Sequence, residues 1–95
     1  MHSKGEYLDR ITTEVDELAT RVAVLKGQFA KQKVSVKLDH YWELELVRTR
    51  FTEFKRRIEE LEEAEGMDIT GLQEKVDTAW KDLTVAIDSL LNALC

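Results

Sequence analysis

Residues 8–29 read LDRITTEVDELATRVAVLKGQF, and their apolar side chains recur at alternating spacings of three and four positions. The recurring residues are Leu8, Ile11, Val15, Leu18, Val22, Leu25 and Phe29. Because an α-helix completes a turn about every 3.6 residues, this spacing places them on one narrow apolar stripe along a helix. Such a stripe is removed from water only when another helix packs against it.

Two further segments of the chain carry the same repeat. The second segment contains Leu44, Val47, Phe51, Phe54, Ile58 and Leu61. The third contains Ile69, Leu72, Val76, Ala79 or Trp80, Leu83, Ile87, Leu90 and Leu94. Three stripes of similar length can cover one another within a single chain. The sequence therefore predicts an all-α protein, an antiparallel three-helix bundle or coiled coil.

Local signals indicate where the helices begin and end. Ser3 followed by Glu6 fits a capping box at the start of the first helix. Gly66 can take the left-handed conformation that ends the second helix, and Asp68 or Thr70 can cap the third. The helices expected from these signals span about residues 4–31, 39–65 and 69–94.

Residues 30–41 allow two interpretations. The repeat changes phase by one residue across this segment, which favours a turn and helices that run up, down and up. However, the segment holds no glycine or proline, and a slower eleven-residue repeat of apolar positions can be followed through it. Polar and apolar side chains also alternate at residues 33–38, as they do in a strand. The alternative is one helix from about residue 4 to residue 64 plus a C-terminal helix, associating as an oligomer. That helix would extend about 90 Å and be only half covered, so we favour the compact bundle.

The composition is typical of one helical domain spanning residues 1–95. The chain has no proline and 35% charged residues, and its net charge is −5 with basic residues interspersed among acidic ones. This pattern disfavours nucleic acid as a partner, because nucleic-acid binding needs concentrated positive charge. The first residues lack the apolar core of a signal peptide, and no run of about 18 apolar residues could cross a membrane. We therefore expect a cytoplasmic protein that has no membrane partner.

The sequence shows no recognisable catalytic or cofactor-binding motif. Neither His2 nor His40 has the glutamate three residues earlier that a di-iron bundle uses, and the ligands are too few for structural zinc. Nucleophile motifs and phosphate-binding glycine loops are also missing. We therefore expect a protein without enzymatic activity or cofactor; the alternative is a bundle that holds a metal or small apolar ligand. Cys95 is either a free thiol or a crosslink between two chains.

A basic cluster in the second expected helix consists of Arg48, Arg50, Lys55, Arg56 and Arg57. Glutamates follow it, and Arg56 with Glu60 and Lys55 with Glu59 have the four-residue spacing of ion pairs within a helix. We interpret the cluster as a solvated helix surface with ion pairs.

Large apolar side chains near the stripes exceed what one bundle needs to bury. They are Tyr41, Trp42, Leu46, Trp80, Val85 and Leu91. Contiguous apolar patches usually mark contact surfaces, so these residues are the candidates for an interface with a second copy or another helical protein. The alternative is a generous core around the C-terminal helix. Lipid binding is disfavoured by Asp82 and Asp88, which would oppose an anionic membrane.

The segment KLDHYWELELVR at residues 37–48, the charged continuation to Glu65 and the segment AWKDL at residues 79–83 resemble a known protein group. They are similar to small bacterial coiled-coil proteins related to a stress-associated cyanobacterial family. Members commonly have an aromatic residue before a Glu- and Leu-rich helix, a glycine-containing turn, and a last helix with an Ala-Trp pair. The resemblance covers about residues 5 to 90 and implies an intracellular helical protein linked to stress tolerance, with no catalytic residues.

Overall fold

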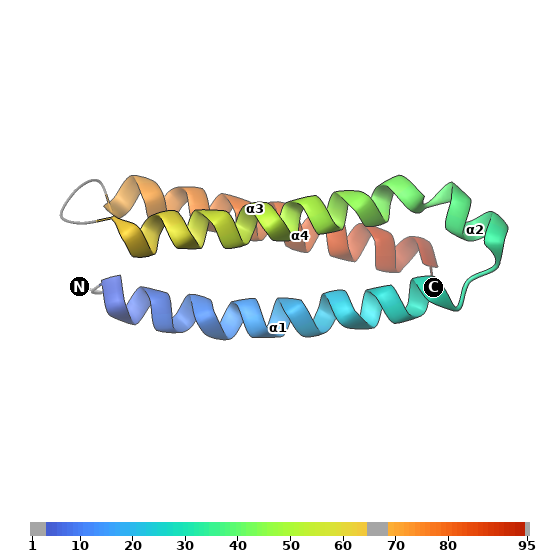
Figure 1. Ribbon diagram of the computed structural model, residues 1–95, viewed down its shortest axis with the longest axis horizontal. Helices are drawn as coiled ribbons and strands as arrows, with labels where there is room; N and C mark the ends of the chain where they lie inside the picture. The colour runs from blue at the N-terminus through green and yellow to red at the C-terminus, as the bar shows by residue number, and fades with distance from the viewer. Residues whose placement is uncertain (1–3, 65–68, 95) are drawn as a thin grey trace.

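The computed structural model describes residues 4–64 and 69–94. These residues form four helices, namely α1 (Lys4–Ala30), α2 (Val34–Asp39), α3 (Tyr41–Glu63) and α4 (Ile69–Leu94). The three long helices lie alongside one another in a rod of 51 × 19 × 17 Å, and α2 connects α1 to α3 at one end (Figure 1). No strand is present within the described ranges, so the predicted all-α helical bundle is confirmed.

Helices α1 and α4 run in the same direction, and α3 runs opposite to both (Figure 1). Side-chain contacts between α1 and α4 occur in the same order along both helices, as expected for parallel helices. Tyr7 is hydrogen-bonded to Asp77 near the start of both helices, and Arg21 forms an ion pair with Asp88 farther along. The up-down-up order predicted from the three stripes is therefore the order observed.

The chain leaves the helical path at residues 31–33, so the alternative of one continuous helix is wrong. Helix α1 ends at Ala30, and Lys33 is extended, with φ −66° and ψ 154°. The reversal allows α3 to cover the stripe of α1 within the same chain, whereas a continuous helix would leave both stripes in water. The strand-like alternation at residues 33–38 belongs to α2, whose last turn is closed by the His40 amide donating to the Val36 carbonyl at 3.1 Å.

The boundaries of the first and second expected helices differ slightly from those observed, and those of the third agree. His40, with φ −113° and ψ 12°, separates α2 from α3, so α3 begins at Tyr41. Helix α4 begins at Ile69, so Thr70 lies within its first turn and is not its cap. The other residues named for caps, turns or crosslinks lie outside the described ranges, and they are Ser3, Gly66, Asp68 and Cys95.

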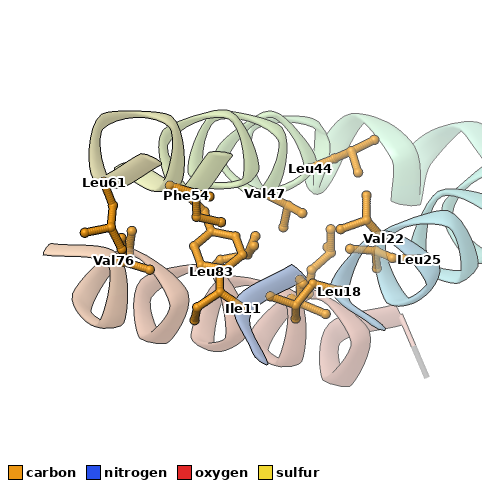
Figure 2. Close-up of a cluster of buried hydrophobic side chains, with 14 of the residues drawn as sticks. Ile11, Leu18, Val22, Leu25, Leu44, Val47, Phe54, Leu61, Val76 and Leu83 are labelled. Atoms are coloured by element: carbon orange, nitrogen blue, oxygen red, sulfur yellow. The ribbon is translucent and has the colours of Figure 1, made fainter. Parts of the chain in front are cut away.

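The core consists of the predicted stripes, which meet along the axis of the bundle (Figure 2). Its buried members are Tyr7, Ile11, Leu18, Val22, Leu25, Leu44, Val47, Phe54, Ile58, Leu61, Val76, Ala79, Leu83, Ile87 and Leu90. Every one except Tyr7 belongs to the repeat. Where the repeat allowed either Ala79 or Trp80, Ala79 is buried and Trp80 is exposed. A small residue at this position allows the side of α4 that faces α3 to pack closely.

Candidate interaction surface

Most of the apolar residues proposed for an interface are exposed. Trp42 is 79% exposed, and Tyr41, Leu46, Trp80 and Val85 also fall in the exposed class. Covering such a large, exposed apolar side chain with a partner is favourable, because it removes apolar surface from water.

Leu91 differs from the other candidates, because it is half-buried and packs against the core. Its place on α4 is therefore explained by packing within the bundle, and it adds little to an outer surface.

The structure brings three of the candidates together on one side of the bundle. Leu46 on α3 and Val85 on α4 line the same surface groove, which has a volume of about 300 Å³. Trp42 lies one helical turn before Leu46, so both side chains occupy neighbouring positions on α3. We call the surface formed by Trp42, Leu46, Val85 and Ala86 the α3–α4 apolar face.

Trp80 is not part of this face. It lines a different groove between α1 and α4, together with Arg10, Glu14, Asp77 and Lys81. The two tryptophans therefore lie on separate surfaces of the bundle.

Tyr41 supports the position of Trp42. The two rings meet edge to face, with centroids 5.2 Å apart and an interplanar angle of 78°. Edge-to-face contact is a favoured aromatic geometry, so Tyr41 restricts the orientations of the Trp42 ring before any partner arrives.

Two exposed apolar residues on α2 were missed by the sequence analysis. Val34 is 70% exposed and Leu38 is 71% exposed. They are four residues apart within α2, so they lie on one face of this short helix. This spacing was present in the sequence, but the alternating pattern of residues 33–38 left the local structure ambiguous.

The groove beside the apolar face carries balanced charge. Glu43 and Asp82 provide two carboxylates, and Arg50 and Lys81 provide two positive charges. Glu43 is also paired with His40, whose Nδ1 atom lies 3.1 Å from Glu43 Oε2. A partner that approaches this groove therefore meets polar groups of both signs at its rim.

The basic cluster forms ion pairs within α3, although with different partners from those predicted. Arg56 pairs with Glu53 at 2.8 Å and Arg57 pairs with Glu60 at 3.1 Å. The hydrogen bond from Arg56 lowers the pKa of Glu53, because it stabilises the carboxylate form. The pairing is thus mostly at three-residue spacing, and the expected pair of Arg56 with Glu60 is not formed.

Lys55 also differs from the prediction, which paired it with Glu59. Its Nζ atom lies 5.8 Å from the centre of the Phe51 ring, within the range of a cation–π contact. The ammonium group of Lys55 therefore contacts the half-buried ring of Phe51, whereas the four-residue spacing had predicted an ion pair with Glu59.

Within residues 4–64 and 69–94, no three His, Cys, Asp or Glu side chains gather in a position to hold a metal ion. The same ranges contain no helix that is long and apolar enough to cross a membrane. Comparisons of the chain with family models, curated proteins and solved structures give no significant match.

Proposed function

We propose that this protein is a non-enzymatic structural or interaction module that acts through helix packing and associates with itself through the α3–α4 apolar face. One observation carries the proposal: Trp42 is 79% exposed and lies one helical turn before Leu46, which lines a groove together with Val85. Buried tryptophans dominate the energetics of many protein interfaces, so leaving one in water has a cost that a partner removes.

The exposed apolar area supports a contact of useful size. Trp42 alone exposes roughly 200 Å², and together with Tyr41, Leu46 and Val85 it exposes on the order of 500 Å² of mainly apolar surface. One partner in a standard protein interface contributes about 800 Å². These side chains therefore supply more than half of what one partner of a specific dimer contributes, and too little for a large obligate assembly.

In keeping with the resemblance to small bacterial coiled-coil proteins, we further propose a cytoplasmic location and a role in stress tolerance. A different helical protein could use the same face, and the experiment below distinguishes that case from self-association.

The test is sedimentation equilibrium over a range from low micromolar to near-millimolar protein. The wild-type mass is expected to rise from monomer to dimer, and Trp42→Ala is expected to remain monomeric. Truncation of an interface tryptophan typically costs about 2 kcal/mol or more, and a dimer of the variant loses one tryptophan from each copy, so its association should be weaker by on the order of 1,000-fold.

The matched control is Trp80→Ala, which removes the other tryptophan from a separate groove and should leave the dimer intact. Helix content measured by circular dichroism should be the same in the wild type and Trp42→Ala, because Trp42 is outside the core. A wild-type protein that stays monomeric at every concentration would refute self-association.

A further inference from the structure

We infer that Trp42 of a second copy inserts into the groove between α3 and α4, and that the insertion is reciprocal about a two-fold axis. The inference rests on the proposed self-association and specifies its geometry and its occupant.

The groove has the size and lining that an indole ring requires. Its volume of about 300 Å³ is at the lower end of the range of roughly 300 to 1,000 Å³ for sites that hold small organic groups. Leu46 and Val85 provide its apolar walls, and Ala86 is small enough to leave room for a ring between them. The lining also includes Leu90, whose side chain is fully buried in the core.

The rim of the groove can satisfy the one polar atom of the inserted ring. A buried indole N–H needs an acceptor, because an unpaired donor costs about 1 to 3 kcal/mol. The carboxylates of Glu43 and Asp82 both line the groove and accept hydrogen bonds. A tryptophan can therefore donate to one of these carboxylates, whereas a leucine or phenylalanine has no donor to offer them.

The charges of the groove permit two copies to approach. The chain has a net charge of −5, so two copies repel each other over most of their surfaces. At the groove, Arg50 and Lys81 balance Glu43 and Asp82. The groove itself therefore carries no net charge that would oppose the approach of a second copy.

The inserting ring and part of the receiving groove lie on the same helix, α3, and this placement suits a dimer with a two-fold axis. Trp42 lies one turn before Leu46, so the inserting group and the receiving groove belong to the same surface. Two copies related by a two-fold axis can then exchange their tryptophans, and both grooves are filled at once. Such an interface is closed, which gives a dimer and not an extended filament.

The first test follows the fluorescence of Trp42 in a Trp80→Phe variant, which leaves one tryptophan in the chain. The emission of Trp42 is expected to move to shorter wavelength as the protein concentration rises through the dimerisation range. Val85→Glu places a charge in the groove without changing the ring, and it should abolish the shift. Val85 is exposed, so the substitution should preserve the fold, and Val85→Lys repeats the test with the opposite charge.

The second test mixes two variants that cannot form either reciprocal contact alone. Trp42→Ala keeps an intact groove but has no ring, whereas Val85→Glu keeps the ring but has a blocked groove. The mixed dimer regains one of the two insertions, so the mixture should associate about 30-fold more tightly than either variant alone. Sedimentation of each variant and of an equimolar mixture measures the difference.

The outcomes separate this inference from the proposed function. If the wild type dimerises but Trp42 emission stays that of an exposed indole and the mixture shows no gain, insertion is wrong and self-association stands. If the wild type remains monomeric, both are wrong. A shift abolished by Val85→Glu, together with recovery in the mixture, supports both.

Discussion

The hydroxyl of Tyr7 donates a hydrogen bond to the carboxylate of Asp77 across 2.6 Å, joining the first turn of α1 to the third turn of α4. The carbonyl oxygen of Gln73 lies 3.3 Å from the same hydroxyl. The ring of Tyr7 is 7% exposed and packs in the core, and the Arg10 guanidinium lies 4.9 Å from its centre. One side chain thus adds both apolar packing and a polar contact between two helices that are far apart in the sequence.

Tyr7→Phe should lower the free energy of unfolding by about 1 to 2 kcal/mol, because it removes a charge-assisted hydrogen bond and keeps the ring. Asp77 is exposed, so water can replace the lost donor and limits the loss. Urea denaturation measures the change. Tyr41→Phe is the control, since Tyr41 is exposed and its ring contact with Trp42 survives. Equal stability of wild type and Tyr7→Phe would show that the hydrogen bond contributes nothing.

The same contact predicts a loss of stability at alkaline pH. Burial, reinforced by the hydrogen bond to Asp77 and by its negative charge, raises the pKa of Tyr7 above the ordinary value of 10.0. A group whose pKa is raised on folding stabilises the protein below its unfolded pKa, and the contribution declines as pH rises above that value. The wild type should therefore lose more stability than Tyr7→Phe between about pH 9 and pH 12. Parallel curves for the two proteins would contradict the raised pKa.

Val47→Ala should destabilise the bundle by about 2 kcal/mol. Val47 is fully buried between the helices, so the substitution removes apolar contacts and leaves a small cavity (Figure 2). Val24→Ala is chemically identical at a position that is 54% exposed on α1, and its effect should stay within about 0.5 kcal/mol. Thermal unfolding of the three proteins provides the comparison. Similar losses at both sites would be inconsistent with the assigned core.

Gly27→Ala should stabilise the protein by about 0.5 to 1 kcal/mol. Gly27 lies inside α1, and an added Cβ would meet no atom within 4 Å. Alanine restricts the unfolded chain and favours the helix, so its methyl group brings a gain without a steric penalty. Ala23→Gly, at an exposed position of the same helix, should have the opposite effect of similar size. A destabilised Gly27→Ala variant would mean that the glycine serves a contact outside the monomer.

The candidate surface was only partly predictable from the sequence. Trp42, Leu46 and Val85 were identified as excess apolar residues, because none of them fits the buried stripe of its helix. Their meeting in one groove depends on the rotation of α3 against α4, which a repeat within one helix does not encode. Trp80 was placed with them as a large side chain beside the stripe, although its position on α4 turns it toward α1.

The ion pairs in α3 were also predictable from the sequence only in part. The sequence indicated that acidic and basic residues would pair along the helix, and they do. Spacing alone allowed Arg56 either Glu53 or Glu60, since residues three and four positions apart are both neighbours on a helix. Glu53 is contacted by both Arg56 and Arg57, so the local arrangement of several side chains decides the partner.

The sequence by itself determined that this chain forms helices and which apolar stripe of each long helix faces the core, because a period near 3.5 directs every apolar stripe to one side. Only the tertiary structure decided that the chain reverses after Ala30, that Ala79 and not Trp80 enters the core, and that Leu46 and Val85 share a groove. Those outcomes depend on distances and rotations between helices. Close packing of whole side chains sets them, and no pattern within a single helix contains that information.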